Sequence, residues 1–282
     1  MPIALYYKAL LSDFSPDIKL IEKQEVLHFY SDYPHEMNLE SWHRLYKEYP
    51  QTPESIPARL RYARHLAGQG RLEKARQMLH EALQMAAERL GGLKEKKEIT
   101  QQDNEKISTI FKSPAESVIS EFDLLELKRE LNELITLISQ QNYTQDEQSQ
   151  RRLAVFVMLN PHSKNYCHQL DDLSEKLEDN DPLADNVMLA NAMMIERDAE
   201  KVNQLSKIHE KFSGSDAAVQ ALYELSRLRI ELWQKCQKND TEKKNQLLAV
   251  AKNKLKEFIN LYPESFYTQE ARKKLNDLPG SD

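Results

Sequence analysis

Apolar side chains recur at three- and four-residue steps along much of the chain, which is the spacing of one face of an α-helix. Three stretches show this most clearly, and each carries polar residues on its other positions. The apolar positions are Leu124, Leu127, Leu131, Leu134, Ile135 and Ile138 in the first stretch, Ala218, Ala221, Leu222, Leu225, Leu228 and Leu232 in the second, and Ala251, Leu255, Phe258, Ile259 and Tyr262 in the third. One helix cannot bury such a stripe alone, so we expect stacked neighbouring helices to cover it.

A short motif, which we call the punctuating phrase, recurs between these predicted helices. It consists of an aromatic or apolar residue, then proline or glycine, then Ser or Thr. Its hydroxyl residues are Thr52, Ser163, Ser215 and Ser265. We expect the preceding helix to end at the aromatic or apolar residue, and the hydroxyl residue to form the next N-cap. The last two copies lie 50 residues apart, which indicates an internal repeat.

The clearest single repeat spans about 56–89. Ala63 is followed by Gly70 at a predicted turn, and then by Ala75, Leu79 and Ala82 at helical spacing. Small residues let two antiparallel helices approach closely, and glycine suits the turn between them. This pattern resembles the tetratricopeptide repeat. The resemblance implies an all-α fold, a right-handed α-solenoid of antiparallel helix pairs.

The same resemblance implies a partner. Tetratricopeptide proteins bind a peptide or helix of another protein on a concave surface, which the first helix of each pair lines. Leu60 and Arg64 would face that groove, and Arg64 would pair with a carboxylate of the partner. The expected function is therefore a non-enzymatic protein-interaction scaffold or adaptor.

The C-terminal run of Tyr262, Pro263, Ser265, Ala271 and Leu275 resembles the repeats of bacterial outer-membrane assembly lipoproteins and of coordinators of the Tol-Pal system. That resemblance implies an alternative function, a cell-envelope assembly factor in a larger periplasmic complex. The chain shows no lipobox cysteine near its start and no evident signal peptide. A cytoplasmic location is the default expectation, and a periplasmic one applies if the chain is a processed product or a fragment.

Composition supports the helical prediction and excludes some partners. The 282 residues include only 6 Gly and 11 Pro, which favours long helices with few tight turns. The net charge is −6, so we expect no basic field that attracts nucleic acid, although Arg59, Arg61 and Arg64 leave a local basic face open. No window approaches the roughly 20 apolar residues of a membrane span.

A polar segment at 91–112 divides the expected helical blocks, which are 1–90 and 113–282. It begins at Gly91-Gly92 and is rich in Lys, Glu, Gln and Asp, so we interpret it as a polar linker or a solvated helix. Ser113 and Pro114 then have the form of a new helix start.

The sequence carries little that indicates catalysis or a cofactor. The motifs of phosphate-binding, dinucleotide-binding and serine-hydrolase sites are absent. His162, Cys167 and His168 form the densest group of metal-ligand types, but the simpler interpretation is a thiol beside a surface imidazole. We predict no catalytic, cofactor or metal site; a single disulfide between Cys167 and Cys236 remains an alternative to two free thiols.

Tyrosines concentrate in the first 50 residues. They are Tyr6, Tyr7, Tyr30, Tyr33, Tyr46 and Tyr49. We favour packing between helices as their role, and the alternative is an aromatic surface for a peptide, because Tyr supplies large contact area at low entropic cost.

Overall fold

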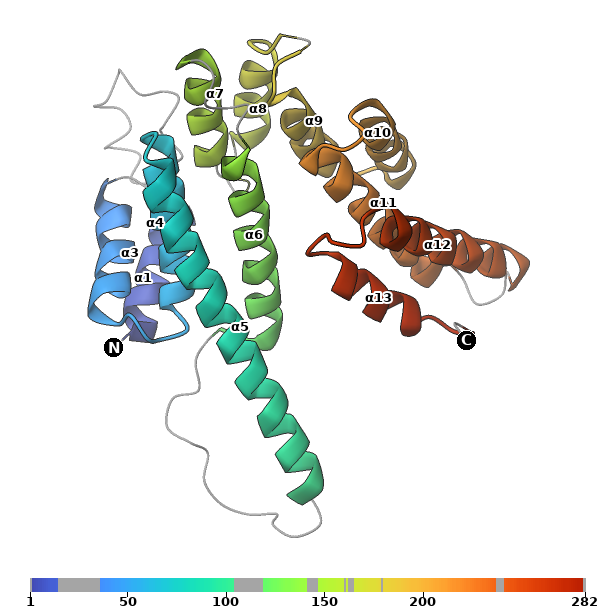
Figure 1. Ribbon diagram of the computed structural model, residues 1–282, viewed down its shortest axis with the longest axis horizontal. Helices are drawn as coiled ribbons and strands as arrows, with labels where there is room; N and C mark the ends of the chain where they lie inside the picture. Colours follow the sequence, from blue (N-terminus) through green and yellow to red (C-terminus); the bar gives the residue numbers. More distant parts are fainter. Residues whose placement is uncertain are drawn as a thin grey trace. The chain divides into compact units, whose positions relative to one another are not determined.

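The computed structural model describes residues 2–14, 36–103, 119–140, 147–159, 161, 165–178, 180–236 and 241–280. Regular structure in these residues consists of twelve helices, with no strand, so the all-α prediction is confirmed (Figure 1). The chain divides into two compact units, Met1–Gln169 (unit 1) and Leu170–Asp282 (unit 2). The division falls within α8 (Tyr166–Ser174).

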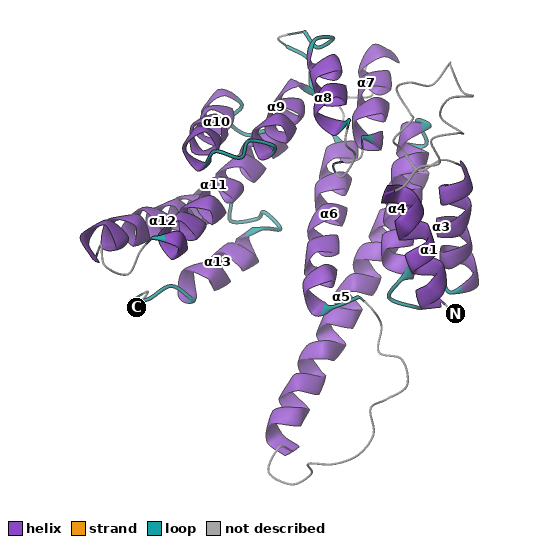
Figure 2. Cartoon of the chain, turned by 180° about the vertical axis from the view of Figure 1, so that it is seen from behind, coloured by secondary structure: helices purple, strands orange, loops and turns teal. Residues whose placement is uncertain are grey.

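In unit 1, most described helices pack against a neighbour in the sequence, and α7 packs instead against α4. The central pair is α4 and α5; α4 also packs against α3, α6 and α7, α5 packs against α6, and α1 packs against α3. Figure 2 shows that mostly short loops join these helices where the connection is described. The helices are α1 (Pro2–Phe14), α3 (Glu36–Glu48), α4 (Ser55–Gly68), α5 (Leu72–Asp103), α6 (Glu121–Ser139) and α7 (Glu147–Met158).

The hairpin of α4 and α5 forms as the sequence predicts. Ala63 on α4 and Ala75, Leu79 and Ala82 on α5 are all fully buried, as expected for small residues where two helices pack closely. Gly70 has a φ of 74° in the turn, a conformation that side chains with a Cβ rarely adopt.

Unit 2 also packs in sequence order. Helix α10 packs against α9 and α11, α12 packs against α11 and α13, and α9 also reaches α11. The helices are α9 (Ala184–Met193), α10 (Asp198–Lys211), α11 (Asp216–Lys235), α12 (Thr241–Leu261) and α13 (Thr268–Asn276). The predicted stripes of α11 and α12 face this core, where Leu222, Leu225, Leu255 and Phe258 are buried.

The punctuating phrase forms the same corner in three places. In each corner the aromatic residue donates its backbone N–H to the carbonyl four residues earlier, and its own carbonyl accepts from the N–H three residues later. The corner aromatics are Tyr49, Phe212 and Tyr262, with N–O distances of 3.1, 3.0 and 2.9 Å for the first bond and 3.1, 2.9 and 3.1 Å for the second. In the remaining copy, Ser163 lies outside the described residues.

The predicted N-cap is confirmed at Ser215 and wrong at two other corners. Ser215 Oγ accepts from the backbone N–H of Ala218 at 3.1 Å, at the start of α11. Helices α4 and α13 instead begin three residues after Thr52 and Ser265, because those two corners continue through a further turn. In each, the N–H of the first helical residue donates to the carbonyl of that Thr or Ser, at 3.0 and 2.9 Å.

The polar segment does not divide the molecule where we expected. Helix α5 continues through Gly91 to Asp103, so residues 91–103 belong to a helix, while 104–112, Ser113 and Pro114 lie outside the described residues. Helix α6 packs against α5 in unit 1, and the division between units lies at Gln169–Leu170 instead of between blocks 1–90 and 113–282. A polar composition reports solvent exposure, and it does not report which helices pack together.

Candidate protein-binding surface

Leu60 and Arg64, the predicted partner-binding residues, both engage the interior of unit 1. Leu60 is 2% exposed, so it belongs to the core and does not line an open surface. Arg64 is partly buried, and its Nη1 donates to the carbonyl oxygen of Val157 at 3.3 Å. That carbonyl lies in the last turn of α7, where helix carbonyls lack intrahelical partners. Arg64 therefore caps α7, and a cation there also suits the helix dipole.

Another group on α4 is better placed to meet a partner. Two residues of α3, His43 and Tyr46, face two residues of α4, Tyr62 and His65, and we call these four the His–Tyr strip. The Tyr62 ring stacks at 5.1 Å from His43 and 6.2 Å from Tyr46, measured between centroids, and lies 6.1 Å from His65. All four side chains are partly exposed. The strip therefore gathers four partly exposed rings where the two helices meet.

A buried arginine holds one end of the strip. Arg59 is 6% exposed, and its guanidinium carbon lies 4.9 Å from the centroid of the Tyr46 ring. Its Nη1 donates to Ser55 Oγ at 2.7 Å, and its Nε lies 3.8 Å from a carboxylate oxygen of Glu81 on α5. Arg59 therefore contacts α3, α4 and α5 at once, and its positive charge pairs with Glu81.

The polar atoms of the strip are largely unused within the described part of the chain. No hydrogen bond from the Tyr46 hydroxyl, the Tyr62 hydroxyl or the His43 ring to another described residue is present. Burial, followed by the charge of Lys47, holds the pKa of His43 below its usual range, so this ring is neutral at neutral pH. His65 differs, since its Nε2 lies 2.8 Å from Nε2 of Gln69.

A comparison within the chain shows that packing alone does not require these residue types. The corners at Tyr49 and Tyr262 match, so α3 and α4 can be compared position by position with α12 and α13. The positions equivalent to Tyr46, Tyr62 and His65 are Ile259, Leu275 and Leu278, which pack into or against the core of unit 2. The position equivalent to His43 is Lys256, which is exposed. Aliphatic side chains therefore suffice at three of the four positions, and the two tyrosine hydroxyls and the His65 imidazole of unit 1 are additional chemistry.

The sequence pointed to only part of this strip. Tyr46 belonged to the group of N-terminal tyrosines for which a peptide surface was an alternative, while His43, Tyr62 and His65 were missed. A pattern in the sequence could have indicated the strip. His43 precedes Tyr46 by three residues on one helix, and His65 follows Tyr62 by three residues on the next. In an antiparallel pair, these spacings bring the rings together. Trp42 is 1% exposed and belongs to the core of unit 1, and Tyr30 and Tyr33 lie outside the described residues.

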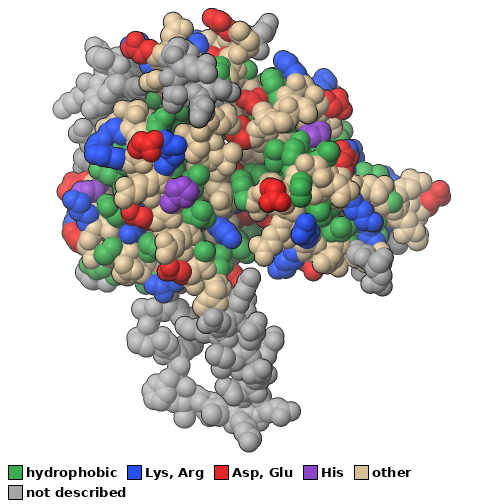
Figure 3. Space-filling model, viewed as in Figure 1, with side chains coloured by type: hydrophobic (Ala, Val, Ile, Leu, Met, Phe, Trp, Pro, Cys, Tyr) green, Lys and Arg blue, Asp and Glu red, His purple; other side chains and the backbone are tan. Residues whose placement is uncertain are grey.

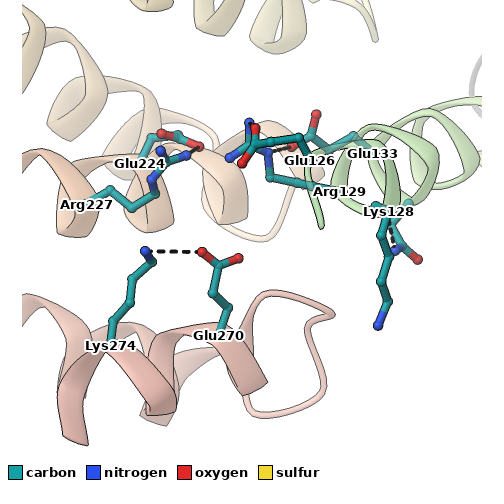
Figure 4. A network of polar contacts seen from close by, with 9 residues as sticks. Glu126, Lys128, Arg129, Glu133, Glu224, Arg227, Glu270 and Lys274 are labelled. Atoms are coloured by element: carbon teal, nitrogen blue, oxygen red, sulfur yellow. Dashed lines mark hydrogen bonds and ion pairs between the residues drawn. The ribbon is translucent and has the colours of Figure 1, made fainter. Parts of the chain in front are cut away.

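Other charged groups form local pairs within one unit. In unit 1, Arg129 pairs with Glu126 and lies 3.6 Å from Glu133 along α6. In unit 2, Lys274 lies 3.2 Å from Glu270 along α13 (Figure 4). Pairs three or four residues apart on one helix stabilise that helix modestly. Figure 3 shows basic and acidic side chains interspersed on the displayed face. Because the described residues on the displayed face form no surface of a single charge sign, selection of a charged partner would depend on a local group of side chains.

The described residues contain no group of three or more His, Cys, Asp and Glu placed to hold a metal ion. Cys167 and His168 are exposed on α8, and His162 lies outside the described residues. Both cysteines are free thiols, so the disulfide alternative is wrong in this structure. None of the described helices has the length and apolar character that a membrane span requires.

Comparisons of the chain with protein-family models, with curated proteins and with solved structures found no match.

Proposed function

We propose that this protein is a non-enzymatic interaction scaffold, an α-solenoid of tetratricopeptide-like helix pairs that binds a peptide or helix of another protein. The observation that carries the proposal is the His–Tyr strip, four partly exposed rings, three of which (Tyr46, Tyr62 and His65) occupy positions that are aliphatic in the matching seam of unit 2. Tyrosine is enriched at protein interfaces because its ring gives contact area and its hydroxyl gives a directed hydrogen bond.

Two features support the repeat architecture. The same corner hydrogen bonds recur at Tyr49, Phe212 and Tyr262, and most helices adjacent in sequence pack together within each unit. Repeat proteins are built in this way, because each helix pair buries its apolar face only against its neighbours. The partner surface proposed here replaces the groove lined by Leu60 and Arg64.

The test exchanges the strip for the seam of unit 2. A Tyr46→Ile, Tyr62→Leu, His65→Leu variant carries the aliphatic residues found at the equivalent positions and keeps an apolar seam. The variant and the wild-type chain would be used to capture proteins from the native extract, with circular dichroism to verify the fold. A matched control is Arg272→Gln, since Arg272 is exposed and occupies the position in α13 that matches Arg59.

We expect the wild-type chain and the Arg272→Gln control to capture the same partner, and the strip variant to lose it. Capture of the same proteins by a folded strip variant would remove the strip as the binding surface.

A further inference from the structure

We propose that the His–Tyr strip recognises an acidic peptide segment, whose carboxylates accept hydrogen bonds from the hydroxyls of Tyr46 and Tyr62 and from the ring of His43. This inference rests on the proposed scaffold function and narrows it to a class of partner.

The strip offers several hydrogen-bond donors to a ligand. Tyrosine hydroxyls and the imidazole ring can donate, and those of Tyr46, Tyr62 and His43 make no hydrogen bond to other described residues. His43 and Tyr62 stack at 5.1 Å, so each uses one ring face on the other. The donors lie at the ring edges, and ring edges are electropositive. A group of ring edges with several donors matches a ligand rich in acceptors.

Carboxylates near the strip would repel such a ligand, and two of them lie beside arginines. Glu81 lies 3.8 Å from the buried Arg59, and Glu48 accepts from Arg44 Nε at 2.8 Å. Lys47 lies close enough to His43 to lower the pKa of that imidazole, and it forms no ion pair within the described residues. The cation next to the strip is therefore available, while two of the neighbouring acids are neutralised. An anionic segment gains from this arrangement and a cationic segment does not.

A proline-rich segment is a poorer match to the strip. Such a segment needs open aromatic faces or a slot between rings to receive its pyrrolidines. His43 and Tyr62 stack at 5.1 Å with 30° between their planes, so this pair leaves no slot between its two rings. The geometry thus favours recognition by hydrogen bonds at the ring edges.

The test compares two labelled peptides by fluorescence anisotropy with the full chain, a Gly-Glu repeat and its Gly-Gln counterpart of the same length. The chain has a net charge of −6, so long-range attraction does not favour the acidic peptide, and its binding reports a local site. We expect the Gly-Glu peptide to bind about tenfold more tightly than the Gly-Gln peptide, which is the effect of one hydrogen bond to a charged acceptor.

Variants separate the donors from the packing. Tyr62→Phe keeps the stacked ring and removes one hydroxyl, so it should weaken binding of the Gly-Glu peptide severalfold and binding of the Gly-Gln peptide less, because a neutral amide is the weaker acceptor. The strip variant with Tyr46→Ile, Tyr62→Leu and His65→Leu should lose the preference for Glu, while Arg272→Gln should keep it. Circular dichroism again verifies that each variant is folded.

Two results would overturn the inference. Equal affinity for the two peptides, or an unchanged preference for Glu in the folded strip variant, would show that the strip does not select carboxylates. If partner capture from the extract still depended on the strip in that case, only the proposal of an acidic partner would be refuted, and the scaffold function would be retained. If capture were also independent of the strip, both proposals would be refuted.

Discussion

Arg64 gives the sharpest test of how the structure reassigns a residue first expected to bind a partner. Its Nη1 donates to the Val157 carbonyl at 3.3 Å, in the last turn of α7. A hydrogen bond from a charged donor contributes about 1.5–3 kcal/mol when buried, and this one is long and only partly buried. We therefore expect Arg64→Met, which keeps the apolar stem, to lower the free energy of unfolding of unit 1 by about 1–2 kcal/mol.

Arg64→Glu should cost more than Arg64→Met. It removes the same donor and also places an anion near the negative end of the α7 dipole, a change of up to about 1 kcal/mol. The order of stability should therefore be wild type, then Arg64→Met, then Arg64→Glu.

The chain offers a simple reporter for this measurement. Of its two tryptophans, Trp42 is buried in unit 1 and Trp233 is partly buried in unit 2. A Trp233→Phe background makes Trp42 the sole tryptophan, so its fluorescence during urea unfolding follows unit 1. We expect the midpoint to fall with an unchanged dependence on urea. Arg71→Met is the control, because Arg71 is exposed and only its backbone makes a hydrogen bond among the described residues.

A clear result would refute this reasoning. If Arg64→Met left the unfolding midpoint unchanged but abolished partner capture, Arg64 would act at a binding surface, and its contact with α7 would not matter for stability.

Three further predictions concern stability. Tyr223 is fully buried with its ring 4.3 Å from that of Tyr267, so Tyr223→Ala should destabilise unit 2 by about 3–5 kcal/mol and remove hydrogen-exchange protection from α11 to α13; retained protection would contradict this. Burial raises the pKa of Asp185, so its favourable contribution is present at low pH and is lost as pH rises. Asp185→Asn should therefore gain stability over the wild type as pH rises from acidic to neutral, and thermal melts with a pH-independent difference would refute this. Gly70→Ala should lower the free energy of unfolding by about 1 kcal/mol, because φ is 74° at this position. Gly91→Ala should raise it by about 1 kcal/mol, because Gly91 lies inside α5 with open space around it. If urea unfolding showed that both substitutions change stability in the same direction, this explanation would be excluded.

Local features of the fold were predictable from the sequence because local spacing encodes them. The stripes of α6, α11 and α12, the turn at Gly70 and the N-cap at Ser215 all depend on residues within a few positions of one another. The N-cap prediction failed at Thr52 and Ser265 because the corner hydrogen bonds there continue for another turn before the helix begins. Composition and hydroxyl position did not distinguish these two kinds of corner.

The sequence by itself determined that this chain forms amphipathic helices with recurring corners, and that most apolar positions are core. Only the tertiary structure decided which helices pair, and hence that α5 joins α6 within unit 1, that Leu60 is covered, and that Arg64 caps α7. It also brought His43, Tyr46, Tyr62 and His65 into one strip. The reason is that helical periodicity shows which face of a helix is buried, whereas the partner that buries it depends on contacts between residues distant in sequence.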